Sequence, residues 1–170
     1  MIFDRIGTLT EITTNAEYTG AVGSARRGQV YIDRAAGKKY IFLMNNAATA
    51  TATQLGTRAL TTDKTNFYCQ VMSTTITANE LLFAGARVTS ATTVAQNESG
   101  WYQIGGSATL TASSDTTTAD LGVVCSNQSA GQVEAAADSA AGIRGTFGIA
   151  ETSTSSADVV VKITNSVWGI

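Results

Sequence analysis

The sequence has no histidine, no proline and few charged residues. Histidine is the commonest general base, the commonest metal ligand and the usual partner of a Ser or Cys nucleophile, so its absence argues against many hydrolases and metalloenzymes. Charged residues make up only 14% of the chain, against about 25% in a typical soluble domain. This shortage argues against long surface helices, which are rich in Glu, Lys and Arg. The absence of proline indicates no particular fold or function.

Cysteine and long apolar runs are also scarce. Cys69 and Cys125 form no CxxC motif, so buried thiols are the default expectation and a disulfide stays open. No apolar run approaches the roughly 18 residues of a membrane span. The N-terminus lacks the apolar core of a signal peptide. We therefore expect a soluble protein that is made in a cytoplasm and has no membrane partner.

Thr, Ala, Ser and Gly take the place of the missing charge, and β-branched Thr favours strands. Strand-length apolar or alternating segments recur between Gly, Asn, Asp and Ser residues. The expected strands are Val30–Arg34, Lys39–Met44, Asn66–Met72, Trp101–Ile104, Ala108–Ala112, Leu121–Cys125, Phe147–Ala150 and Val159–Ile163. These segments predict an all-β fold, a single β-sandwich or barrel of jelly-roll type. At most one short helix is expected, near residues 77–85, where a capping-box pattern competes with a strand through Leu81-Leu82-Phe83.

Two stretches share one pattern, a strand followed by an Ala-Gly turn and a return strand. The first turns at Ala36-Gly37 and the second at Ala130-Gly131, and residues 77–83 resemble a degenerate third copy. This pattern predicts repeated hairpins. We divide the chain into an N-terminal arm, residues 1–25, which we expect to be a contact segment, and a β-rich domain, residues 26–170. A further division into two subdomains near residues 88–98 stays open.

Charge is unevenly distributed although the net charge is only −2. Residues 1–87 carry nine bases and six acids, a net of +3, whereas residues 88–170 carry two bases and seven acids, a net of −5. The bases concentrate in Arg26, Arg27, Arg34, Lys38 and Lys39. They form either a solvated hairpin with charged edges or a patch that meets an acidic partner. Nucleic acid is the weakest partner, because aromatic residues are not interleaved with the bases.

No motif with a chemical mechanism is present. Residues 142–148 have GxxGxxG spacing without the strand-to-helix context of a dinucleotide site, and a glycine-rich approach to the next strand explains them. Nothing selects a catalytic pair from the scattered carboxylates Asp115, Asp120, Glu134 and Asp138. We therefore expect no enzyme activity, no catalytic residue, no metal site and no cofactor.

Aromatic and terminal residues are the best candidates for contacts with other proteins. Trp101 and Gln103 should share one strand face and Tyr102 and Ile104 the other. These aromatics are either core residues or anchors at a subunit contact, where Trp and Tyr are enriched. The chain ends are apolar, so they either complete the sheet of their own domain or dock on a neighbouring chain. The candidate contacts with a partner protein or with another subunit are Ile2, Phe3, Arg26, Arg27, Trp101, Tyr102 and Trp168.

The segment Trp101-Tyr102-Gln103-Ile104-Gly105-Gly106-Ser107-Ala108 resembles a WVQVYG-x-A strand of small structural proteins in tailed-bacteriophage heads. Segments like Thr118–Val124, Ala130–Val133, Phe147–Ala150 and Val159–Ile163 follow it, so the resemblance covers residues 98–164. The chain is thus similar to the family of capsid decoration (cement) proteins. This resemblance implies a homotrimer on the outer surface of the virion that bridges and stabilises major capsid subunits, without binding nucleic acid. The alternative is a β-sandwich that binds a ligand or carbohydrate on a phage tail or fibre.

Overall fold

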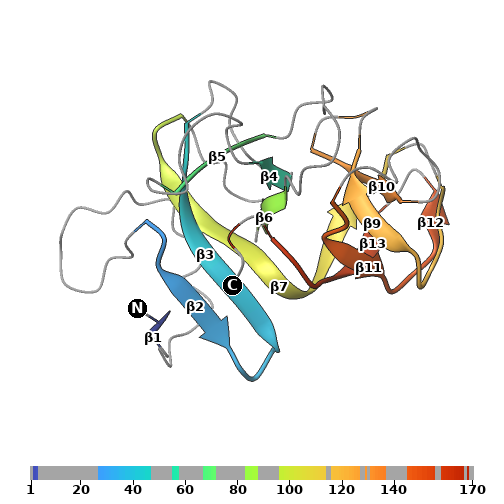
Figure 1. Ribbon diagram of the computed structural model, residues 1–170, viewed down its shortest axis with the longest axis horizontal. Helices are drawn as coiled ribbons and strands as arrows, with labels where there is room; N and C mark the ends of the chain where they lie inside the picture. The colour runs from blue at the N-terminus through green and yellow to red at the C-terminus, as the bar shows by residue number, and fades with distance from the viewer. Residues whose placement is uncertain are drawn as a thin grey trace.

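The computed structural model describes residues 2–3, 27–46, 55–57, 67–71, 83–87, 96–113, 116–126, 129, 131–136, 145–155, 158–166 and 168. These residues are all β, with no helix among them, and Figure 1 shows their arrangement. The predicted all-β, sandwich- or barrel-like fold is confirmed. The strands are β1 (Ile2–Phe3), β2 (Val30–Asp33), β3 (Lys38–Asn45), β4 (Leu55–Thr57), β5 (Tyr68–Val71), β6 (Phe83–Arg87), β7 (Ser99–Thr111), β8 (Thr116–Thr117), β9 (Gly122–Cys125), β10 (Val133–Ala135), β11 (Gly148–Ala150), β12 (Thr154–Ser155) and β13 (Asp158–Ile163).

Eleven strands form one sheet in the order β1-β2-β3-β5-β4-β6-β7-β13-β11-β9-β10, and β8 pairs with β12 separately. An additional pairing of β3 with β7 turns part of this order into a closed circuit of β3, β5, β4, β6 and β7. We call this circuit the first ring. On its outer side β2 pairs with β3 as a hairpin, and β1 pairs with β2 in parallel.

A second circuit follows along the same sheet. Strands β7, β13, β11, β9 and β10 pair in succession, and all these pairs are antiparallel. A parallel bridge between Ala112 and Val133 connects β10 with the residue that follows β7 and so closes the circuit. At this bridge the Ser113 N–H donates to Val133 O at 2.8 Å. We call this circuit the second ring. The two rings lie at opposite ends of the long β7 in Figure 1.

β7 is a single strand of 13 residues, whereas the sequence predicted two strands, Trp101–Ile104 and Ala108–Ala112. The expectation of two strands was wrong because Gly105 and Gly106 bend the strand without ending it. Gly106 has a φ of +79°, a conformation that costs glycine little. The buried Gln103 carboxamide also spans the bend, since its Nε2 donates to Gly105 O and to Ser107 O, each at 3.0 Å.

Each ring encloses its own apolar core. The first-ring core includes Ile41, Leu43, Cys69, Tyr102 and Ile104, as the alternation within the expected strands predicted. The second-ring core is the larger of the two and consists of Phe83, Ala86, Ala108, Leu110, Ala112, Val123, Cys125, Val133, Phe147, Ala150, Val159, Val161 and Ile163.

Phe83 connects the two rings. Its backbone belongs to β6 of the first ring, but its ring stacks on Phe147 of the second-ring core with the centroids 4.0 Å apart and the planes 7° from parallel. The β6 backbone allows this because Gly85 interrupts the alternation, so that Ala84 packs in the first-ring core while Phe83 and Ala86 pack in the second. The two cores are therefore coupled through one strand.

Both predicted hairpins are present, as β2–β3 and β9–β10. Their turns contain Gly37 and Gly131, with φ of +65° and +73°, which explains why glycine stands at the same place in both. Residues 77–82, where a helix competed with a strand, lie outside the described residues, but Phe83 begins strand β6. Cys69 and Cys125 are buried thiols in different cores and do not form a disulfide with each other.

Candidate interaction surface

Phe67 is the centre of a surface at the start of β2 and β5. It has a φ of +52°, which is unusual for an aromatic residue. Its ring lies against Gly28, where a Cβ atom would overlap it, and Gly28 itself has a φ of +78°. On its other side the ring packs on Trp168, with centroids 5.5 Å apart. Glycine at position 28 therefore makes room for Phe67 beside the sheet.

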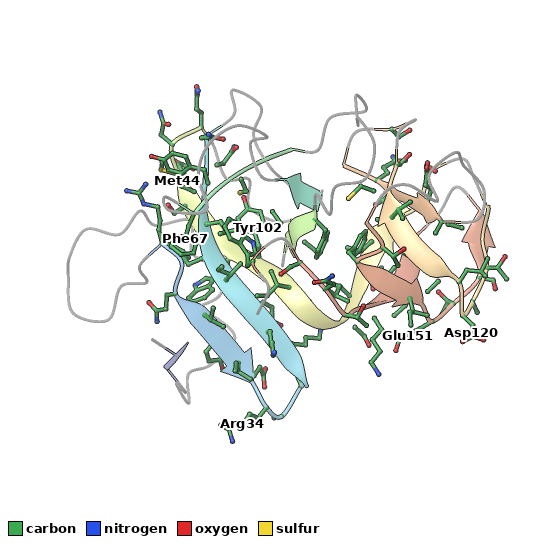
Figure 2. The ribbon with its side chains drawn as sticks, in the orientation of Figure 1. Arg34, Met44, Phe67, Tyr102, Asp120 and Glu151 are labelled. Carbon is green, nitrogen blue, oxygen red and sulfur yellow. The ribbon has the colours of Figure 1, made fainter. Side chains whose placement is uncertain are left out.

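Arg27 brings an exposed positive charge to this surface. Its guanidinium carbon is 5.7 Å from the centroid of the Tyr68 ring, within the range of a cation–π interaction, and Nη1 donates to Met44 Sδ at 3.6 Å. We call the group of Arg27, Met44, Phe67, Tyr68 and Trp168 the Arg27 surface. Figure 2 shows Met44 and Phe67 close together at one end of β3. Arginine and aromatic side chains are the residue types enriched in protein interfaces.

Trp168 anchors the end of the chain to the first ring. Its indole Nε1–H donates to Ala84 O at 2.7 Å, and its ring packs against the first-ring core. The side chain is only half-buried. Of the two alternatives for the apolar C-terminus, docking on its own domain describes this residue.

Of the seven predicted contact residues, four lie around the start of β2, one lies outside the described residues, and two are buried elsewhere. Ile2 pairs with Val30 and Phe3 with Tyr31, so β1 lies beside the first residues of β2, close in sequence to Arg27. Trp168 packs on Phe67, and Arg27 lies over the ring of the next residue, Tyr68. Arg26 lies outside the described residues. Four of the seven candidates, Ile2, Phe3, Arg27 and Trp168, are thus placed around the start of β2.

Trp101 and Tyr102 lie elsewhere and are buried. Tyr102 has no exposed surface and belongs to the first-ring core, whereas Trp101 is on the opposite strand face and 6% exposed. The core interpretation, which the sequence left open for both, describes their positions. Trp101 packs 5.2 Å from Phe42 and 6.3 Å from Tyr31 in a cluster that also includes Tyr40.

The phenol of Tyr40, which belongs to this cluster, has a raised pKa. Burial, with smaller contributions from the Asp33 carboxylate and from Tyr31, raises the pKa of its phenol from 10.0 to about 12. The phenol therefore stays neutral throughout the physiological range and acts as a packing group there.

The basic residues do not form one patch. Arg27 lies at the start of β2, but Arg34, Lys38 and Lys39 lie at the opposite end, around the turn of the β2–β3 hairpin. The turn is stabilised by Asp33, whose Oδ1 accepts a hydrogen bond from the Ala36 N–H at 2.9 Å. The candidate patch is thus divided between two ends of one hairpin.

The described part of the chain contains no group of three or more His, Cys, Asp or Glu side chains placed to bind a metal ion. Glu134, one of the scattered carboxylates, is fully buried and accepts a hydrogen bond from the Ser126 hydroxyl at 2.9 Å. Asp120 is exposed, while Asp115 and Asp138 lie outside the described residues. The described residues form no helix with the length and hydropathy to span a bilayer.

No protein-family model matches the chain, and no curated protein is similar enough to it to indicate a relationship. The role of Phe67 was missed by the sequence analysis. Its importance depends on a left-handed backbone and on contacts with residues 28 and 168, and none of these leaves a local pattern in the sequence. The pairing of β1 with β2 likewise joins segments that no local pattern connects.

Proposed function

We propose that this protein is a capsid decoration protein, which binds the outer surface of a phage head as a homotrimer and bridges neighbouring major capsid subunits. The proposal starts from the resemblance of residues 98–164 to proteins of that class. Its mechanism needs no chemistry, because many weak contacts at symmetry-related positions sum through effective concentration. A shell bridged in this way resists expansion, since expansion would have to break the bridges.

One observation carries the proposal furthest. The N-terminal strand β1, the exposed Arg27 and the half-buried Trp168 meet around the start of β2, although they come from both ends of the chain. An exposed arginine among partly exposed aromatic side chains is the composition of an interface centre. We assign the capsid contact to the Arg27 surface together with β1.

The competing proposal of a carbohydrate-binding module needs aromatic side chains exposed on one sheet face. In the described residues the cluster of Tyr40, Phe42 and Trp101 is 1%, 2% and 6% exposed, and only Tyr31 beside it is partly open. This sheet face therefore lacks the exposed aromatic side chains that carbohydrate binding needs, and the partly exposed Phe67, Tyr68 and Trp168 lie instead beside the charged Arg27. Glycan-array binding by the isolated protein would favour the carbohydrate-binding proposal instead.

The test is co-sedimentation of the purified protein with expanded empty heads of the phage that encodes it. The intact chain should bind saturably. Deletion of residues 1–6 and Arg27→Ala should each lower occupancy, and Arg27→Lys should fall between Arg27→Ala and the intact chain because it keeps the charge but loses the planar group. Thr109→Ala, an exposed position on the second ring, serves as the control.

The outcomes separate two claims. No binding by the intact chain would contradict the capsid function itself. Saturable binding that neither the deletion nor Arg27→Ala weakens would leave the function standing and would disprove the assignment of the contact surface.

A further inference from the structure

Two large hydrophobic residues of the described chain are exposed, and they lie on paired segments of the second ring. Ile149 pairs with Gly122, whereas Leu121 lies opposite the buried Ala150, so their side chains are on opposite faces of the sheet and only Ile149 is on the outer face. Leu121 is 37% exposed and Ile149 is 43% exposed. Leu121 immediately precedes β9 and Ile149 is the middle residue of β11, and these two strands are paired. The Ala150 N–H donates to Leu121 O at 3.0 Å, so the two segments are held side by side.

Acidic side chains flank this apolar pair. Asp120 precedes Leu121, and its N–H donates to Ala150 O at 2.8 Å. Glu151 follows Ala150, and its N–H donates to Val160 O at 2.7 Å. Both carboxylates are exposed. We call Asp120, Ile149 and Glu151 the acidic edge.

Other exposed charges near the acidic edge lie on β13. Lys162 pairs with Ile149, while Asp158 is further along the same strand and accepts a hydrogen bond from the Thr111 hydroxyl at 3.1 Å. With Asp120 and Glu151 this gives three acids and one base. The region around the acidic edge is therefore net negative.

The turn of the β2–β3 hairpin has the opposite character. Arg34, Ala35, Ala36 and Lys39 are all exposed, and Lys38 is half-buried. The turn thus presents two small apolar side chains between basic ones. We call Arg34, Ala35, Ala36 and Lys39 the basic turn.

The basic turn and the acidic edge match each other in charge, and each has an apolar centre. They cannot meet within one chain, since Figure 2 places Arg34 at the tip of the hairpin and Asp120 and Glu151 on the other side of the molecule. The same asymmetry runs through the whole sequence, with a net charge of +3 for residues 1–87 and −5 for residues 88–170.

We propose that the basic turn of one copy docks on the acidic edge of a second copy of this chain, in a head-to-tail contact. The apolar side chains Ala35 and Ala36 would cover Ile149, while Arg34 and Lys39 pair with the two carboxylates. A heterologous contact of this kind closes into a ring when its rotation permits. The inference specifies the self-contact of the homotrimer in the proposed function, but its test uses the isolated protein without capsids, so either can fail alone.

Sedimentation equilibrium of the purified chain tests the contact. The intact protein should associate reversibly, and association should weaken as salt rises, because exposed charges are screened. Arg34→Glu alone and Glu151→Lys alone should each raise the dissociation constant by about tenfold or more. Glu98→Lys makes the same change in charge at an exposed site outside both surfaces and should leave association unchanged.

Complementation distinguishes the contact from a general loss of folding. The double variant Arg34→Glu/Glu151→Lys should associate as the intact protein does, because the two charges are then exchanged at every contact of the ring. An equimolar mixture of the two single variants should recover association only in part, since a ring of three copies cannot alternate two variants and keeps one mismatched contact. A monomeric intact protein, unchanged association in both single variants, or no recovery in the double variant would each overturn the proposal.

Ile149→Ser tests the apolar contact separately. It should weaken association severalfold, since it removes apolar surface from the contact without changing the charge. Thr109→Ser is the matched control on the exposed side of β7. Equal effects of the two substitutions would place the contact elsewhere and overturn the proposal.

Discussion

At the scale of single residues, the Arg27 surface is arranged by backbone conformation and close packing more than by charge. Phe67, Asn97 and Asp120 adopt positive φ, and Phe67 does so while its ring is held between Gly28 and Trp168. The Arg27 guanidinium lies over the aromatic ring of Tyr68. The Arg27 surface is thus organised by stacking, and we expect its geometry to depend little on salt.

Tyr40 provides a prediction about pH. A phenol whose pKa is raised on folding, here from 10.0 to about 12, loses its proton more easily in the unfolded chain. Its contribution to stability is therefore fully present below pH 10 and is lost as pH rises from 10 through 12. The full difference corresponds to about 2 to 3 kcal/mol.

Urea unfolding between neutral pH and pH 12 measures this contribution. The fall in unfolding free energy should be smaller in Tyr40→Phe than in the intact protein, whereas Tyr68→Phe should retain the fall. If the unfolding free energies of the intact protein and of Tyr40→Phe depended on pH in the same way, folding would not raise the pKa of Tyr40.

At the scale of elements, the strands follow the sequence pattern but their connections do not. Val30 and Ile32 face the first-ring core while Tyr31 faces the other way, as alternation predicts. The segments Trp101–Ile104 and Ala108–Ala112 were wrongly expected to be two strands. The consequence is large, because the continuous β7 is shared by both rings.

Gly37 is in the turn of the β2–β3 hairpin, and Gly106 is in β7 beside that turn. Substituting each of them with alanine gives a matched pair of variants. Gly106 and Gly37 both have positive φ, so Ala strains the backbone at both, by about 1 kcal/mol. A Cβ at Gly106 would also overlap Gly37 O and lie 3.1 Å from Lys38 Cα, whereas a Cβ at Gly37 would meet nothing within 4 Å.

Gly106→Ala should consequently lower the unfolding free energy by clearly more than Gly37→Ala does, by a further 1 kcal/mol or so. Chemical denaturation of both variants under the same conditions decides the matter. If the two cost the same, the close packing of the bend against the hairpin turn plays no part in stability.

How much of this arrangement could be predicted depends on the range of the interaction concerned. Short-range patterns located Val30–Asp33, Lys38–Asn45 and Asp158–Ile163 to within a residue or two, and two turn glycines marked the hairpins. Closure of the first ring could not be predicted, because it depends on the short strand Leu55–Thr57, which has no alternating apolar pattern. The candidate site was found in part: Arg27 and Trp168 were named, but Phe67, which packs on Trp168 and against Gly28, was not.

At the scale of the whole molecule, the two rings are connected in two ways. β7 passes continuously from one to the other, and Phe83 extends from β6 into the second-ring core to stack on Phe147. A domain pair joined by a linker would unfold in two steps. Rings that share a strand and a stacked aromatic pair should unfold as one.

Phe83→Ala tests this coupling. Removing a fully buried phenylalanine should cost about 3 to 5 kcal/mol. Because Phe83 contributes to the junction, the variant should lower the stability of both rings together, and near-ultraviolet and fluorescence probes of Trp101 should follow the same transition as backbone circular dichroism. Two separate transitions in the intact protein would contradict the coupling.

The broad distribution of charge is also a property of the whole molecule. A basic turn at one end and an acidic edge at the other suit association in a ring, and they leave the Arg27 surface available for a different partner. The proposed decoration function uses both kinds of contact, one between copies of the chain and one to the shell.

The central claim is that the protein stabilises a capsid, and the most direct measurement is the thermal disruption of expanded empty heads with and without saturating protein, followed by calorimetry. The proposal predicts that decorated heads disrupt at a higher temperature and that the increase follows occupancy. Saturable binding with no change in the disruption temperature, or no binding at all, would contradict it.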